Sequence, residues 1–325
     1  GAGSHDIRRS RVSLAAQKPW WMFWQPDPVE TVLFGANVLP CTTQVGETLL
    51  SQLEDGGEDA FLGALQTQLV SLRSKWQPMG EVAANSDMLQ ARILEVKRAE
   101  EQQQVLADLL HVGTMYRLRA EGMELTRGPL QATTATPECE LTVVPNLNLS
   151  ASLQPLPAEV AVEVQDYVYA AVPADLKADM PLRVGHRSLA PLLMGGALFG
   201  YVLGKAAQAA SGTSPPVTKQ DLTKWSSSGA FVAAAFHVGQ LLGLEPESED
   251  PLRQFGSLEE IATEVCALPR GLESLEEQDS ELTPQDKLNM TVMDVRGLLG
   301  EMCTMGFVLN LWETKIMRFV APNRS

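Results

Sequence analysis

Apolar residues recur at intervals of three and four along most of this chain of 325 residues, and that spacing is typical of amphipathic α-helices. Between Val45 and Trp76 the pattern predicts two helices, separated by the acidic, glycine-containing stretch at 54–59. The range 88–121 has no proline and no glycine before Gly113, so it predicts the clearest helix of the chain. Helical spacing returns near 160–171, 189–210, 230–244 and 295–311.

Three stretches interrupt the helical pattern. The range 130–155 is rich in Thr, Asn, Ser and Pro, which predicts a linker with a short extended piece at 140–144. A second linker is predicted at 211–221. The range 244–286 holds thirteen carboxylates against Arg253 and Arg270, a local charge of −11 (2 − 13). We therefore expect a solvated acidic insert at 245–286.

Two of the predicted helices resemble each other at an offset of 106 positions. The stretch that begins at Leu189 aligns with the one that contains Val295, so that Gly200 falls on Gly306. A third stretch, from Leu106, has a similar start but lacks the glycine. Such self-similarity indicates tandem structural units. The sequence therefore predicts an all-α fold of tandem related helical pairs, joined by linkers and carrying the acidic insert.

Glycines inside the predicted helices need a compensating role, because Gly in a helix interior is less favourable than Ala by about 1 kcal/mol. The simplest role is close helix–helix approach, where a side chain would not fit. Contact with a bound cofactor is the alternative interpretation. The helix-packing candidates are Gly195, Gly196, Gly200 and Gly306.

The segment KPWWMFWQPDP, from Lys18 to Pro28, holds three of the six tryptophans. Its flanking prolines disfavour a long helix through it. Trp is enriched at binding hot spots, so the segment supplies these candidates for docking on a partner: Trp20, Trp21, Phe23 and Trp24. Peripheral contact with a membrane through the same residues is a further expectation. Packing of the segment on this chain's own surface stays open beside docking.

The first 17 residues include three arginines and only one acidic residue, a composition typical of an organelle transit peptide near its cleavage site. A tag or a plain tail is the alternative interpretation. Overall the chain is 45% hydrophobic and 20% charged, which is typical of globular proteins. Its net charge of −15, without a basic cluster beyond the leader, disfavours nucleic acid as a partner.

No residue pattern for catalysis or metal binding stands out. The chain has four histidines and four cysteines: His5, His111, His186, His237, Cys41, Cys139, Cys266 and Cys303. Their spacings match neither a zinc site nor a disulfide framework, and we expect Cys303 to be buried in a core helix. There is no phosphate loop and no nucleophile elbow. We therefore expect no catalytic, metal-binding or cofactor-binding residues, and an apolar stretch at 189–210 that forms a core helix rather than a membrane span.

Three blocks carry a resemblance to a known family: RILEVKRAEEQQQVLADLL, LRVGHRSLAPLLMGGALFGYVLGK and VRGLLGEMCTMGFVLNLWETKI. In order and spacing they resemble the DUF760 family, and the similarity covers most of 45–317. The resemblance implies a plastid or cyanobacterial setting and no accepted catalytic residues. After GYVL the charged run of the family is replaced by small residues at 204–210, so any role of those charges is in doubt here.

These observations divide the chain into a transit-peptide remnant or tag (1–17), a Trp/Pro-rich segment (18–44), an N-terminal helical unit (45–128), a linker (129–155), a first DUF760-like unit (156–210), a second linker (211–221) and a second DUF760-like unit (222–320) with the insert at 245–286. We expect a non-catalytic interaction or scaffold protein of the chloroplast, in the stroma or peripheral on the thylakoid, that assists a protein complex. Binding of a lipid, pigment or tetrapyrrole between glycine-lined helices is the alternative, and an enzyme with an unrecognised site is the second alternative.

Overall fold

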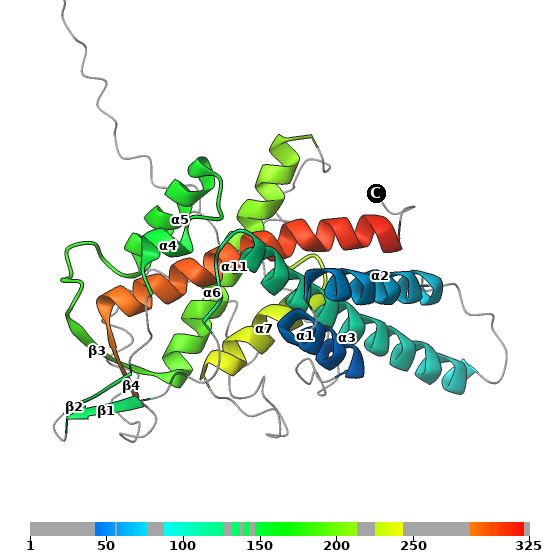
Figure 1. Ribbon diagram of the computed structural model, residues 1–325, viewed down its shortest axis with the longest axis horizontal. Coiled ribbons are helices and arrows are strands. Elements are labelled where there is room, and N and C mark those ends of the chain that lie inside the picture. Colours follow the sequence, from blue (N-terminus) through cyan, green and yellow to red (C-terminus); the bar gives the residue numbers. More distant parts are fainter. Residues whose placement is uncertain are drawn as a thin grey trace, which may run out of the picture.

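The computed structural model describes residues 43–55, 57–76, 88–126, 130, 132–136, 139–142, 147–212, 225–242 and 287–321. These residues are mainly α-helical, as the apolar periodicity predicts. The helices are α1 (Gln44–Asp55), α2 (Glu58–Lys75), α3 (Met88–Ala120), α4 (Leu149–Ser152), α5 (Ala158–Ala171), α6 (His186–Ala210), α7 (Ser228–Leu242) and α11 (Val292–Val320), shown in Figure 1. The predicted acidic insert lies outside the described residues.

Two antiparallel pairs of short strands accompany the helices. Strand β1 (Ala132–Thr136) pairs with β2 (Cys139–Thr142), inside the predicted linker and overlapping the extended piece expected there. Strand β3 (Pro181–Gly185) pairs with β4 (Lys287–Thr291). A strictly all-α prediction is therefore incomplete, because strands of four or five residues are too short to show a clear period of two.

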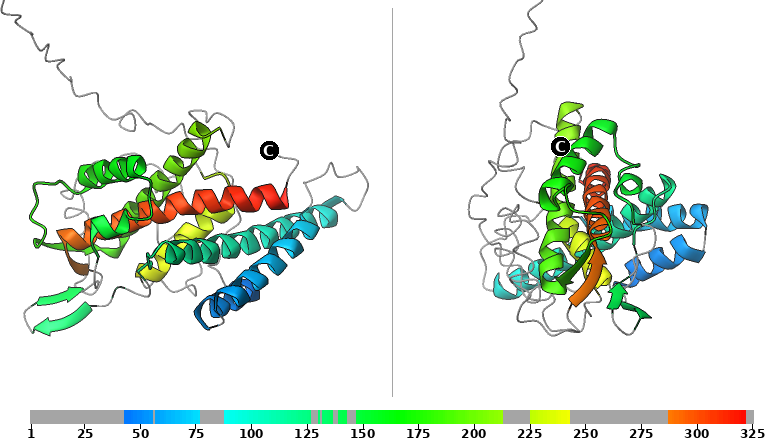
Figure 2. Two further views of the ribbon diagram at one scale, coloured as in Figure 1. Left: turned by 45° about the horizontal axis from the view of Figure 1, so that its top comes forward. Right: turned by 90° about the vertical axis from the view of Figure 1, so that its left-hand side faces the viewer.

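Helix α11 is the centre of the molecule. Helix α6 packs along it, and α2, α3, α4, α5 and α7 also contact it; the two views in Figure 2 show α11 among these neighbours. Every residue from 297 to 310 is buried, as expected for a helix that is surrounded on all sides. The helix begins at a capping box, in which Thr291 and Asp294 satisfy each other's backbone N–H groups.

Helix α6 is long and apolar enough to cross a membrane by length and composition alone. In this structure 89% of the most apolar stretch of this helix, within Leu189–Ala210, is buried inside the protein. The same composition is expected of a core helix enclosed by other helices. The structure therefore places the stretch at 189–210 in the core, as the sequence predicts.

Strands β3 and β4 lead directly into α6 and α11, respectively. In their register Arg183 lies opposite Asn289, and these two positions differ by the same 106 residues that separate Gly200 from Gly306. Because the two strands pair, the N-terminal ends of α6 and α11 are linked through this small sheet.

The side chain of Arg296 on α11 contacts the C-terminal end of α5. The guanidinium of Arg296 donates hydrogen bonds to the backbone carbonyls of Val172, Pro173 and Leu176, just after the end of α5. It also lies 5.3 Å from the centre of the Tyr169 ring. Carbonyls at a helix C-terminus lack partners within the helix, and a cation there is favoured by the helix dipole. Arg296 therefore acts as a C-terminal cap supplied by another helix.

Candidate functional site

Three buried titratable side chains meet where α3, α7 and α11 pack together. His111 and His237 have ring centres 6.0 Å apart, and Nε2 of His237 lies 3.9 Å from Oε1 of Glu301. All three residues are at most 5% exposed. Buried charged residues are rare unless they are paired, so this cluster is the first place to look for chemistry.

The carboxylate of Glu301 binds the chain that follows α3. The backbone N–H of Thr126 donates to Oε1 at 2.5 Å, and the Thr126 hydroxyl donates to Oε2 at 2.8 Å. A carboxylate has about four lone-pair sites, and two of those of Glu301 accept these structural hydrogen bonds. Glu301 thus holds the turn after α3 against the central helix.

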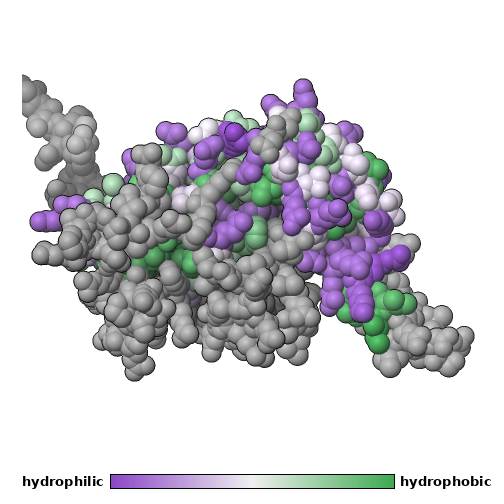
Figure 3. All heavy atoms as spheres, turned by 60° about the horizontal axis from the view of Figure 1, so that its bottom comes forward, coloured by the Kyte–Doolittle hydropathy of each residue, from purple (hydrophilic) through white to green (hydrophobic). Residues whose placement is uncertain are grey.

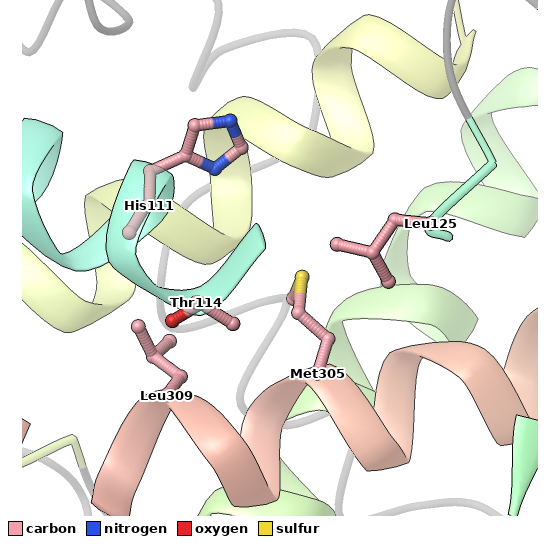
Figure 4. Close-up of a pocket in the computed structure, with 6 residues that line it drawn as sticks. His111, Thr114, Leu125, Met305 and Leu309 are labelled. Atoms are coloured by element: carbon pink, nitrogen blue, oxygen red, sulfur yellow. The ribbon is translucent and has the colours of Figure 1, made fainter. Parts of the chain in front are cut away.

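The pocket beside this cluster is too small to hold a ligand. Figure 4 shows Thr114 of α3 beside Leu309 and Met305 of α11, with Leu125 at the side and the His111 ring directed toward α7. These residues and Ala233 of α7 line the pocket. The pocket does not admit a water molecule. Drug-sized ligand sites are usually clefts of about 300 Å³ or more, so this pocket has no room for a substrate or cofactor in the observed conformation. The described residues also contain no group of three His, Cys, Asp or Glu side chains arranged for a metal ion.

A second buried polar cluster lies between α6, α11 and the start of α7. The fully buried hydroxyl of Tyr201 donates to Oε2 of Glu313 and accepts from the backbone N–H of Ser226 at 2.9 Å. The Trp225 ring packs against Tyr201 with 4.7 Å between ring centres. Nζ of Lys205 lies 5.1 Å from the centre of the Tyr201 ring. Tyr201 and Glu313 therefore fasten the start of α7 to both central helices.

The environment shifts the acidities of both groups in this second cluster. Burial raises the pKa of the Glu313 carboxyl, and the Ser227 hydroxyl, the Tyr201 hydroxyl and the charge of Lys205 only partly oppose that effect. Burial, followed by the charge of Glu313 and the hydrogen bond to it, raises the pKa of Tyr201 well above its usual value. The tyrosine therefore stays protonated at neutral pH and can donate to the Glu313 carboxyl group.

The raised pKa of Glu313 predicts how stability depends on pH. Because the folded-state pKa lies above the unfolded value near 4.5, the stabilisation from this group is complete below about pH 4.5 and is lost as pH rises through the folded pKa. Glu313→Gln removes this titration, so its free energy of unfolding relative to wild type should increase between pH 4.5 and 8. Urea unfolding at several pH values measures the difference. Glu159→Gln, an exposed acid on α5, controls for the loss of one charge, and a constant difference for Glu313→Gln across this range would contradict the prediction.

Gly200 of α6 and Gly306 of α11 lie where the backbones of these two helices touch. A Cβ atom added to Gly200 would lie 1.7 Å from the carbonyl oxygen of Cys303, and one added to Gly306 would lie 1.9 Å from that of Ala197. At Gly196 an added Cβ would lie 2.6 Å from Cδ1 of Leu299. Protein atoms thus fill the space that a side chain would take at all three positions. A pigment or lipid has no room between these glycines.

The remaining predicted positions divide into described and undescribed ones. Gly195 is buried in α6. Cys303 is fully buried, as predicted, and burial strongly raises the pKa of its thiol, which makes it a poor nucleophile. The docking candidates Trp20, Trp21, Phe23 and Trp24 lie outside the described residues.

One buried acid that the sequence did not single out holds the start of the described chain. Asp108 of α3 is fully buried, and its Oδ2 accepts from the Thr43 hydroxyl and, at 3.2 Å, from the backbone N–H of Gly46. Thr43 directly precedes α1 and Gly46 lies in its first turn, so the carboxylate caps that helix from outside. The available signal was a carboxylate on an apolar stripe, between Ala107 and Leu109. Glu301 and Glu313 carry the same signal in α11.

Comparison with known proteins identifies no relative: no family model, no curated protein and no solved structure matches the chain.

Proposed function

We propose that this chain is a non-catalytic helical interaction protein that assists the assembly, stability or regulation of a protein complex. The observation that carries the proposal is how its buried polar groups are used. Asp108 caps α1, Arg296 caps α5 and Glu301 holds the turn after α3. Groups committed to helix ends are poorly suited to acid–base chemistry, which needs a proton acceptor within reach of a substrate.

Exposed aliphatic side chains support the same proposal. Leu62 and Val70 on α2 are 39% and 52% exposed, and Leu94 on α3 is 68% exposed. Single exposed apolar residues are ordinary, but helix faces that combine several of them with charged neighbours suit docking on another protein. Together with the tryptophan-rich segment and the acidic insert, they offer surfaces that a partner could bind.

The setting of this function is also part of the proposal. The transit-peptide-like leader and the resemblance to the DUF760 family both suggest a chloroplast, with the protein in the stroma or peripheral on the thylakoid. The acidic net charge of −15 favours a partner with a basic surface over nucleic acid.

We propose further that the core consists of two related units, each formed by a strand and the helix that follows it. Adding 106 to Arg183 gives its strand partner Asn289. At the same offset, Ala197 corresponds to Cys303 and Gly200 corresponds to Gly306. Gly200 lies against Cys303 and Gly306 lies against Ala197, so the two contacts join equivalent positions of the two units. This reciprocity is what an internal two-fold relation requires. It revises the predicted helical pairs to strand–helix pairs.

The docking proposal predicts that the tryptophan-rich segment is needed for complex formation. A full-length chain with Trp20, Trp21, Phe23 and Trp24 replaced by Ser should lose its partner proteins or its membrane fraction when it is purified by affinity from plastid stroma and membranes, because aromatic anchors dominate binding energy. Val162→Ser on α5, a change at another exposed apolar position, is the matched control. Retention of every partner and of the membrane fraction by the four-residue variant would contradict the docking proposal.

A further inference from the structure

The first part of α3 extends beyond the helices that pack on the rest of it. Gln102 donates to the backbone carbonyl of Lys75 at the end of α2, and Gln103 accepts from the Ser228 hydroxyl at the start of α7. Contacts of α3 with α1 and α11 lie further along, at Asp108 and Leu109. These bonds place the end of α2 and the start of α7 beside Gln102 and Gln103 of α3. We call residues 88–101 the α3 arm; Figure 1 places it at the end of the molecule opposite the strands.

The α3 arm has an uncovered apolar surface. Ile93, Leu94 and Val96 are 47%, 68% and 46% exposed. Figure 3 shows hydrophobic surface beside strongly hydrophilic surface at this end of the molecule. Isolated helices shorter than about 12–15 residues are marginal in water. A helical arm of this length therefore gains stability from any segment that covers its apolar side chains.

We infer that the segment containing Trp20, Trp21, Phe23 and Trp24 of the same chain packs on the Ile93–Leu94–Val96 surface of the α3 arm. The chain has the required reach. Trp24 lies 19 positions before Thr43, and 19 residues span up to roughly 65 Å. Thr43 is itself bonded to Asp108 on α3, from which Ile93 is only about 22 Å away along the helix.

The chemistry of the two surfaces is complementary. The segment brings large aromatic side chains and Met22 to an aliphatic surface. The arm holds three basic and three acidic residues, so it carries no net charge that would oppose the acidic Asp27 and Glu30 of the segment. A tether of this length gives an effective concentration of order millimolar, which favours the chain's own segment over a diffusing partner. A second copy is disfavoured as the occupant, because each copy carries a net charge of −15 and like charges repel.

This inference goes beyond the proposed interaction function and does not depend on it. It makes the tryptophan-rich segment an intramolecular cover of the α3 arm in the isolated protein, so that any partner must compete with the arm for it. The isolated protein can therefore be tested without knowledge of a partner.

Photo-crosslinking of the purified full-length chain tests the contact. A photoreactive phenylalanine analogue at Leu94 should give an intramolecular crosslink to the peptide that contains Trp20–Trp24, identified by mass spectrometry, while the same analogue at Val162 on α5 should not. Mixing chains of natural and heavy isotope composition separates crosslinks within a chain from those between copies. Crosslinks from Leu94 only to a second copy, only elsewhere in the chain, or to nothing would each overturn the inference.

Hydrogen exchange gives a second measurement that needs no photoreactive residue. In the variant with the four aromatic residues replaced by Ser, amides of the α3 arm should exchange about tenfold faster than in wild type, while amides of α11 should be unchanged. Leu94→Asp, which leaves the segment intact but replaces the most exposed apolar side chain of the arm by a charged one, should also accelerate exchange. Equal exchange of the arm in wild type and both variants would also overturn the inference.

Discussion

Replacing Gly200 by Ala is expected to lower the free energy of unfolding by about 4 kcal/mol. The added Cβ would lie 1.7 Å from the carbonyl oxygen of Cys303 and 2.9 Å from its Cα. Both atoms belong to backbone, so no side-chain rotation can relieve the clash. The two central helices must move apart, which opens the most extensive helix–helix interface of the described residues. Urea unfolding followed by far-ultraviolet circular dichroism measures the loss.

A matched substitution separates this clash from the general effect of Gly→Ala in a helix. An added Cβ at Gly63 of α2 would have no atom within 4 Å, so Gly63→Ala should raise stability by up to about 1 kcal/mol through helix propensity. Gly306→Ala should be as harmful as Gly200→Ala. The double variant should lose less than the sum of the two, because the first change already separates the helices. A substitution at a neutral surface position typically changes the free energy of unfolding by no more than about 0.5 kcal/mol. If Gly200→Ala changed it by no more than that, the two helices would not cross as described.

Replacing Asp108 by Ala is expected to cost about 3 kcal/mol. The change removes the acceptor of the Thr43 hydroxyl and one of the two acceptors of the Gly46 N–H, whose other acceptor is the Thr43 hydroxyl oxygen. It also removes a fully buried carboxylate from the start of α1. The effect should be concentrated in α1, whose amides should exchange faster than those of α11. Hydrogen exchange combined with urea unfolding detects both consequences.

Two further variants make the Asp108 prediction specific. Asp108→Asn keeps an acceptor oxygen but not the charge, so it should lose roughly half as much as Asp108→Ala. Glu47 is an exposed acid in the first turn of the same helix, and Glu47→Ala should cost no more than about 1 kcal/mol, as expected of a surface dipole interaction. Equal losses for Glu47→Ala and Asp108→Ala would mean that the buried contact contributes nothing beyond the dipole.

Most helices could be predicted because their information is local. The spacing of Leu49, Phe61, Leu65 and Leu72 predicts α1 and α2, and the structure buries those side chains. The composition of 88–121 predicts α3 to within one residue at its end. Amphipathic periodicity and helix propensity act over a few turns, so they can be recognised without knowledge of the partner helix.

The candidate sites were less accessible to prediction. The Tyr201–Glu313 pair joins positions 112 residues apart, and Thr126 and Glu301 are 175 apart. Neither pair forms a motif in the sequence. Strands β3 and β4 were missed for the same reason, because each finds its hydrogen-bonding partner only across the fold.

By itself the sequence determined the mainly helical class, the position of each long helix and the glycines at which helices could approach. These properties follow from side-chain size and spacing within a single segment. The tertiary structure alone decided which backbone each glycine meets, which helix end each buried charge caps and which part of α3 stays uncovered. Those outcomes depend on how distant segments pack, and one residue's spacing to its neighbours carries no information about a partner a hundred positions away.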